Sequence, residues 1–125
     1  MSIVGIIKVK KIFLVLIFLF FSVSACTDPK EVAESESQEA AAYVAQMELG
    51  LEVFNNKAQC GMCHTLQAAG SEGQIGINLD QLKPLMPQVV AAVTNGNGVM
   101  PAFEGILSSE EIDAVAYYVF ESTNK

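Results

Sequence analysis

The stretch "QCGMCH", residues 59–64, places two cysteines two residues apart and a histidine directly after the second. That histidine, His64, is the only one in the chain of 125 residues. Two thiols and one imidazole packed this tightly occur in four kinds of site, and the residues around the motif decide among them.

Three of the four kinds of site fit the chain poorly. A structural zinc centre needs four nitrogen or sulfur ligands, and the chain offers one histidine and only two free thiols once Cys26 carries the lipid expected of it. A thioredoxin-like dithiol belongs in a βαβ unit, which the sequence does not predict. A cysteine nucleophile needs a histidine facing it across the fold, and the adjacent residues Cys63 and His64 cannot easily meet in that way.

The fourth kind of site is the covalent attachment of haem, for which C-x-x-C-H is the typical motif. The thiols of Cys60 and Cys63 add to the two vinyl groups of the porphyrin, and the two residues between them give the chain enough length to bridge those groups. His64 then lies beneath the ring, where its imidazole can bind iron. The motif therefore predicts one haem c held by two thioether bonds.

The opposite side of the iron has no second histidine, which leaves water, an open position or a methionine sulfur. Of the five methionines, Met86 and Met100 are the candidates, and each is followed by proline. A methionine can also simply fill a gap in a core. Met100 is preferred because it follows a glycine-rich turn and precedes the last helix, where the chain can fold over the far face of the ring.

The amino terminus has the pattern of a secretory signal peptide over residues 1–25. Lys8, Lys10 and Lys11 precede the apolar run 12–23, which is too short to cross a hydrocarbon core of about 30 Å as a helix. The ending "VSAC" (23–26) resembles the processing box of bacterial lipoproteins. That resemblance implies a lipid anchor at Cys26 on the periplasmic side of a membrane, and a plain signal peptide with an unmodified Cys26 is the alternative.

The predicted mature chain is strongly acidic. Removal of residues 1–25 leaves four lysines, no arginine and fourteen acidic residues, a formal net charge of −10. Such a surface excludes nucleic acid as a natural partner and attracts proteins with a basic docking surface. Residues 26–39, acidic and rich in serine, are predicted to form a flexible tether ahead of a domain over 40–125.

The domain is predicted to be all-α, because no stretch alternates as a strand would. Ser35 with Gln38 indicates a helix start, and the stripe that follows ends near residue 56. One or two short helices are expected over 78–96, broken or started at Pro84 and Pro87 and ended by Asn95–Gly96. Ser108 with Glu111 forms a capping box for the last helix. The apolar residues that define the first and last helices are Val44, Met47, Leu51 and Phe54, and Ile112, Val115, Ala116, Val119 and Phe120.

Over residues 41–122 the sequence resembles the small class I cytochromes c of bacteria. The resemblance rests on four segments in the family's order and spacing: "CGMCHTL" (60–66), "GINL" (76–79), "GVMPAF" (98–103) and "LSSEEIDAVAYYV" (107–119). It implies three to five helices wrapped around one haem, with the first and last helices crossing closely.

Matching positions in the family assign roles to particular residues. The resemblance implies that Gly50 and Phe54 meet Val115 and Tyr118 at the helix crossing. The family often has Gly-Pro where this chain has Gly76–Ile77. The carbonyl of that second residue orients the histidine ligand, and a backbone carbonyl survives the change from proline to isoleucine.

With His64 and Met100 on the iron, no position is open for a small-molecule substrate. The expected function is therefore electron transfer between redox partner proteins of the periplasm or membrane, without enzymatic activity of its own. Two alternatives remain. The pattern "CHTL…AVTNG…GVMPAF" also resembles cytochrome subunits or acceptors of periplasmic dehydrogenases, including sulfite-oxidising ones. A vacant sixth position would instead indicate a gas-binding or peroxidase-like haem protein.

Overall fold

The computed structural model describes residues 29–125, with side chains from residue 36 onward. The chain divides into two compact units, Met1–Glu36 and Ser37–Lys125, and the predicted site lies in the second. The predicted signal peptide and Cys26 lie outside the described residues. Within residues 29–125, every helix is too short or too polar to cross a membrane.

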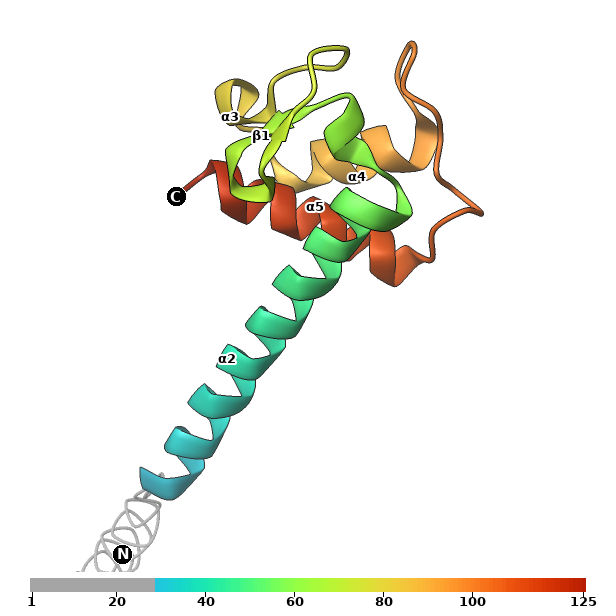
Figure 1. Cartoon of the computed structure of the whole chain (residues 1–125). Helices are drawn as coiled ribbons and strands as arrows, with labels where there is room; N and C mark the ends of the chain where they lie inside the picture. Colours follow the sequence, from blue (N-terminus) through green and yellow to red (C-terminus); the bar gives the residue numbers. More distant parts are fainter. Residues whose placement is uncertain (1–28) are drawn as a thin grey trace, which may run out of the picture. The chain divides into compact units, whose positions relative to one another are not determined.

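Four α-helices and three shorter helical turns make up most of the described chain (Figure 1). The α-helices are α2 (Pro29–Glu52), α3 (Leu79–Leu82), α4 (Met86–Asn95) and α5 (Ser109–Thr123). A π-turn (Val53–Lys57) and two 3₁₀ turns (Cys60–Met62 and Gln67–Ala69) lie between α2 and α3. The all-α class is thus confirmed. A small antiparallel pair, β1 (Thr65–Leu66) and β2 (Ser71–Glu72), was not predicted, because two-residue strands show no alternation.

Helix α2 begins much earlier than the sequence pattern predicts. A flexible tether is predicted over 26–39, and for residues 29–39 this is wrong, because they form the first turns of α2. Proline is favoured at the first helical position, and Glu, Ala, Gln and Lys, which dominate these turns, are good helix formers. Ser35 consequently lies inside the helix and not at its start.

The close crossing of α2 and α5 is confirmed. A Cβ atom at Gly50 would lie 2.3 Å from the carbonyl oxygen of Ala114 and 2.4 Å from Cβ of Tyr118. The rings of Phe54 and Tyr118 lie 6.1 Å apart, and Val115 is 1% exposed. Only a residue without a side chain allows two backbones to approach this closely.

The buried face of α2 differs from the predicted stripe. Val44 and Leu51 are exposed, at 52% and 36% of their surface. Met47 packs against the core, and Tyr43 packs edge-on against Tyr117 at 6.0 Å. The close approach to α5 at Gly50 decides which face of α2 is buried. The spacing of apolar residues in the sequence predicts a neighbouring face instead.

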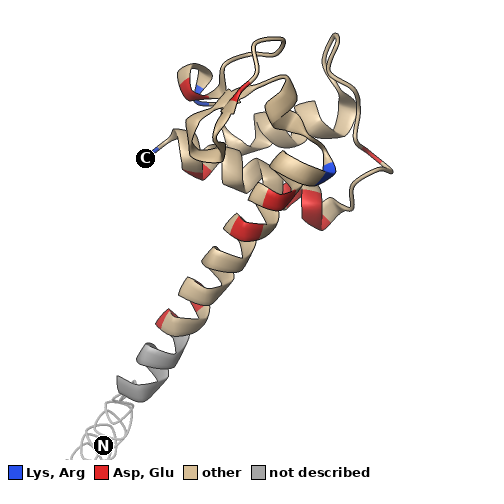
Figure 2. Cartoon of the chain, viewed as in Figure 1, with Lys and Arg blue, Asp and Glu red and all other residues tan. Residues whose placement is uncertain are grey.

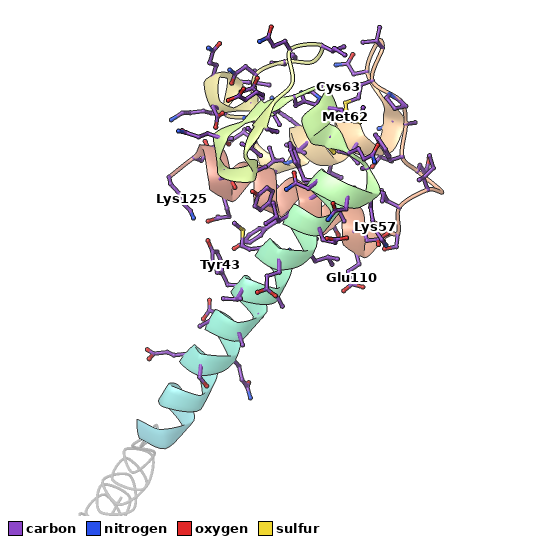
Figure 3. All side chains as sticks on the ribbon, in the orientation of Figure 1. Tyr43, Lys57, Met62, Cys63, Glu110 and Lys125 are labelled. Atoms are coloured by element: carbon purple, nitrogen blue, oxygen red, sulfur yellow. The ribbon has the colours of Figure 1, made fainter. Side chains whose placement is uncertain are left out.

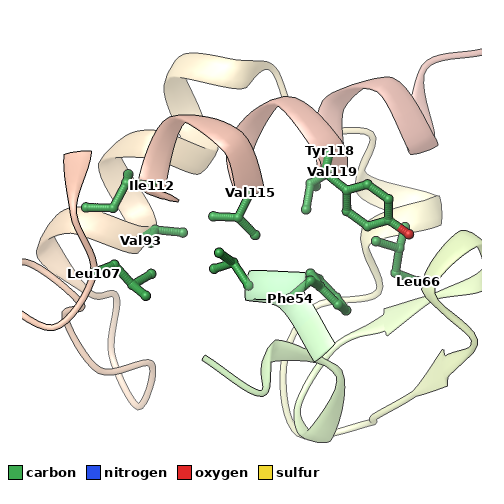
Figure 4. Close-up of a cluster of buried hydrophobic side chains, with 9 residues drawn as sticks. Phe54, Leu66, Val93, Leu107, Ile112, Val115, Tyr118 and Val119 are labelled. Carbon is green, nitrogen blue, oxygen red and sulfur yellow. The ribbon is translucent and has the colours of Figure 1, made fainter. Parts of the chain in front are cut away.

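The last helix is built as predicted. The Ser108 hydroxyl accepts a hydrogen bond from the backbone N–H of Glu111, and the Glu111 carboxylate accepts one from the N–H of Ser108. Side chains of α5 point toward Phe54 in the hydrophobic core (Figure 4). The core cluster consists of Val53, Phe54, Leu66, Val93, Leu107, Ile112, Val115, Tyr118 and Val119.

The predicted region of one or two short helices contains two, α3 and α4. The Asn78 side chain accepts a hydrogen bond from the Gln81 N–H at 3.1 Å and so starts α3. Pro87 lies in the first turn of α4, and the helix ends at Asn95, with Gly96 as its cap. Helix α4 packs against α5, which also contacts the π-turn.

Candidate haem-binding site

The cysteine–histidine motif folds into one tight turn. The backbone N–H groups of Cys63 and His64 both donate to the carbonyl oxygen of Cys60, at 3.0 and 2.9 Å. Both thiols are free, so the motif does not hold a disulfide. Met62, between them, is 70% exposed. Met62 and Cys63 lie on the turn that carries the motif (Figure 3). The turn therefore presents two unlinked thiols and the imidazole within five residues.

The imidazole of His64 is oriented by the backbone of Ile77. Nδ1 lies 2.8 Å from the carbonyl oxygen of Ile77, which can only accept a hydrogen bond, so Nδ1 carries the proton. The lone pair on Nε2 is then available to bind a metal. The prediction that a backbone carbonyl replaces the family's proline carbonyl at this position is confirmed.

Gly76 allows the chain to pass close to the imidazole. A Cβ atom there would lie 2.5 Å from Cε1 and 2.7 Å from Nδ1 of His64. The N–H of Gly76 also donates to the carbonyl oxygen of Cys63 at 2.7 Å. The ring is therefore held against backbone on one side, which limits its rotation.

Two further hydrogen bonds hold the loop between the motif and α3, and the sequence did not predict either. The Thr65 hydroxyl donates to the carbonyl oxygen of Gly73 at 2.8 Å. The Asp80 carboxylate accepts from the N–H of Gln67 at 2.9 Å. No sequence signal indicates such bonds, because the partners are eight and thirteen residues apart.

The chemistry of the thiols argues against the alternative sites. Burial, opposed by a backbone hydrogen bond and aided by the nearby Cys63, raises the pKa of the Cys60 thiol to about 11. A catalytic cysteine or a metal thiolate needs the opposite shift. Within residues 29–125, no group of three or more His, Cys, Asp or Glu side chains is arranged to hold a metal ion.

The structure places Met100 on a separate loop from His64. The N–H groups of Met100 and Asn97 each donate to the other's carbonyl oxygen, at 3.0 and 3.1 Å, which closes a tight turn. Phe103 returns this loop to α4 by donating its N–H to the carbonyl oxygen of Val93 at 2.9 Å. Met100 is partly buried and packs, like Cys60, against the hydrophobic core.

Met86 has a different setting. It is the first residue of α4, where the helix itself restrains its backbone, and it is also partly buried. It is not among the side chains that pack against the core cluster, which include Met47 and Met100.

These residues fit a covalently bound haem. Two free thiols on one turn can form thioethers, and the imidazole offers Nε2 while its Nδ1–H is fixed by a carbonyl. The helical frame and this turn together define a mono-haem c-type cytochrome.

The comparisons with known proteins agree. The family model described as "Cytochrome C oxidase, cbb3-type, subunit III" matches residues 45–119. The chain is 39% identical over 80 residues to cytochrome c6 of Leptolyngbya boryana, covering 61% of this chain and 92% of the relative. It is 32% identical over 85 residues to cytochrome c6 of Bryopsis maxima, covering 63% and 94%. The chain belongs to the class I cytochrome c family.

One solved structure is also similar. The crystal structure of the c-type cytochrome SorU from Sinorhizobium meliloti superposes with a TM-score of 0.61 at 49% sequence identity. The match covers 65% of this chain and 94% of SorU. The chain accordingly carries one covalently bound haem c and is an electron carrier, not an enzyme.

Proposed function

We propose that the haem is held by thioethers to Cys60 and Cys63 and that its iron is bound by His64 and Met100. The observation that carries this proposal is the hydrogen bond from His64 Nδ1 to the Ile77 carbonyl, which leaves Nε2 as the free ligand. The turn at Asn97–Met100 supports Met100 as the second ligand, because it restrains the backbone that carries the methionine side chain.

A histidine–methionine pair suits an electron carrier. With both axial positions filled, the iron binds no substrate and can only gain or lose an electron. Methionine ligation also favours ferrous iron and raises the reduction potential.

The methionine assignment is tested by the far-red absorption band that a sulfur–iron bond gives in the ferric protein. Met100→Ala should abolish this band, and the matched variant Met86→Ala should retain it. Retention of the band in Met100→Ala would refute the assignment. Absence of the band from the unmodified protein would favour the open sixth position.

The charge distribution supports partners with a basic surface. Acidic side chains concentrate on α2 and α5, while the segments 58–71, 73–79 and 84–103, which include the motif and Met100, contain no Lys, Arg, Asp or Glu (Figure 2). The acidic helices attract a basic partner from a distance, and the uncharged loops meet it at contact.

Stopped-flow electron transfer to a basic redox protein should slow as salt is added, because salt screens this attraction. Substitution of Glu48 and Asp113, both exposed, by Gln and Asn should weaken the salt dependence. A rate independent of ionic strength would contradict the basic partner.

The chain is further proposed to be exported by its first 25 residues and anchored to a membrane through lipid on Cys26. The support is the sequence pattern at residues 8–26. Cys26→Ser should move the cytochrome from the membrane fraction to the soluble periplasmic fraction with unchanged haem content. If the variant stayed membrane-bound, the anchor would lie elsewhere.

A stable subunit of a dehydrogenase complex is the second candidate, supported by the segments 63–66, 92–96 and 98–103, which resemble such subunits. Gel filtration of detergent extracts separates the two functions. A shuttle elutes alone, whereas a subunit co-elutes with dehydrogenase activity.

A further inference from the structure

Two hydrogen bonds join the segment 64–67, which begins at the histidine of the motif, to the segment 77–80, which leads into α3. The first links His64 to the carbonyl of Ile77 at 2.8 Å. The second links the N–H of Gln67 to the carboxylate of Asp80 at 2.9 Å. Asp80 lies three residues after Ile77, and Gln67 lies three residues after His64. The two bonds therefore link the same two segments at successive points, and form a first rung (His64–Ile77) and a second rung (Gln67–Asp80) between them.

Both ends of the second rung are firmly placed. Gln67 follows Leu66, which is fully buried, and it begins a 3₁₀ turn, so its N–H has no partner within that turn. Asp80 is partly buried in the first turn of α3, whose start is fixed by the Asn78 cap. Its neighbour Leu79 packs against the core.

We propose that Asp80 is a positioning residue that sets the distance between the Ile77 carbonyl and the His64 imidazole, and through it the reduction potential. This inference rests on the proposed ligation of iron by His64. A carbonyl that accepts from the ring N–H makes the imidazole a stronger electron donor to the metal. Stronger donation stabilises ferric iron, so the rung holds the potential down.

Loss of the second rung lets the segment around Ile77 move away from the imidazole. The first hydrogen bond then weakens and donation to iron falls. The potential rises as a result. The negative charge of Asp80 also favours ferric iron, so the test must separate the effect of the charge from that of the hydrogen bond.

Two variants of the full-length holo-protein make this separation. Asp80→Asn removes the charge but keeps an oxygen that can accept from Gln67, whereas Asp80→Ala removes both. The potential should rise in both variants, and further in Asp80→Ala. Asp113→Ala, which removes an exposed acid on α5, is the charge control and should have the smallest effect.

Hydrogen exchange at His64 Nδ1, followed by NMR, is the second readout. Exchange should be about fivefold faster or more in Asp80→Ala, the ratio that loss of one ordinary hydrogen bond produces, and nearly unchanged in Asp80→Asn. A general loss of folding would show as lost helicity by circular dichroism. Asp80→Asn, which keeps the hydrogen-bond acceptor, tests the proposal without that loss.

The results distinguish failure of this inference from failure of the proposed function. If the His64 ring resonances of the unmodified protein lack the large shifts caused by bound iron, the ligation is wrong. If those shifts are present but Asp80→Ala and Asp80→Asn have equal potentials and unchanged exchange, only the role of Asp80 is refuted.

Discussion

At Gly76 the backbone runs so close to the His64 imidazole that no side chain fits between them. This contact, the Ile77 carbonyl and the turn at Cys60 orient one ring from three directions. The motif itself is readable in the sequence because its residues are neighbours. The tight packing around His64 is not readable, because it depends on a loop that returns after twelve residues.

Gly76→Ala should displace the His64 ring, because its Cβ would lie 2.5 Å from Cε1. Overpacking of this kind costs about 1–3 kcal/mol. We expect a lower yield of holo-protein and a shifted reduction potential, measured by absorption spectroscopy and redox titration. Gln74→Ala, at an exposed position two residues earlier, is the control and should behave like the unmodified protein. An unchanged reduction potential in Gly76→Ala would show that the loop moves aside and leaves the His64 ring in place, which contradicts the expectation.

At the scale of elements, local signals gave the better predictions. The start of α5 is correct because a capping box is a contact between residues three apart. The start of α2 is wrong because acidic, serine-rich composition indicates a tether while the same residues also favour a helix. The pair Tyr43–Tyr117 was missed, since it forms only where α2 meets α5.

Gly50→Ala tests the crossing of α2 and α5. The added methyl group would meet backbone at Ala114 as well as Tyr118, and backbone cannot rotate away. We expect a loss of at least about 1–3 kcal/mol in the free energy of unfolding, measured by denaturant titration of the holo-protein. Glu48→Ala, exposed on the same helix, should change it by less than about 0.5 kcal/mol. Equal stability of the two variants would contradict the close crossing.

An ion pair joins the π-turn before the motif to the start of α5. Lys57 binds the carboxylate of Glu111, and together with the N–H of Ser108 it lowers the pKa of Glu111 below its usual 4.5. A group whose pKa is lower in the folded state stabilises the fold above its ordinary pKa. That contribution is lost as the pH falls through the folded-state pKa.

Glu111→Gln should therefore destabilise the protein at neutral pH and progressively less at acid pH, as the carboxylate becomes protonated below its lowered folded-state pKa. Denaturant titrations at neutral and at acid pH measure this difference. Glu110→Gln, an exposed neighbour, serves as the control. A destabilisation of the same size at both pH values would show that the charge of Glu111 does not stabilise the fold.

At the scale of the unit Ser37–Lys125, the protein core is small. The largest fully buried side chains are Val53, Phe54, Leu66 and Val115. The chain has no tryptophan, and domains of this size are only marginally stabilised by their own apolar surface. A covalently held haem adds a large apolar group to such a core.

Cys60→Ser combined with Cys63→Ser removes both attachment points. We expect this variant to lose much of its helicity, measured by circular dichroism, and to unfold at lower temperature than the holo-protein. Met100→Ala, which keeps the thioethers, is the comparison and should retain its helicity. Full helicity in the double variant would show that the polypeptide folds without its cofactor.

The sequence by itself determined the class of protein, the turn that bears the thiols and His64, and the helix α5, because each depends on residues close together in the chain. Only the tertiary structure decided which face of α2 is buried, how the Ile77 carbonyl and Gly76 hold the imidazole, and that Asp80 bonds to Gln67. These contacts join residues about a dozen or more positions apart, and no local pattern records which distant backbone group will satisfy a given donor.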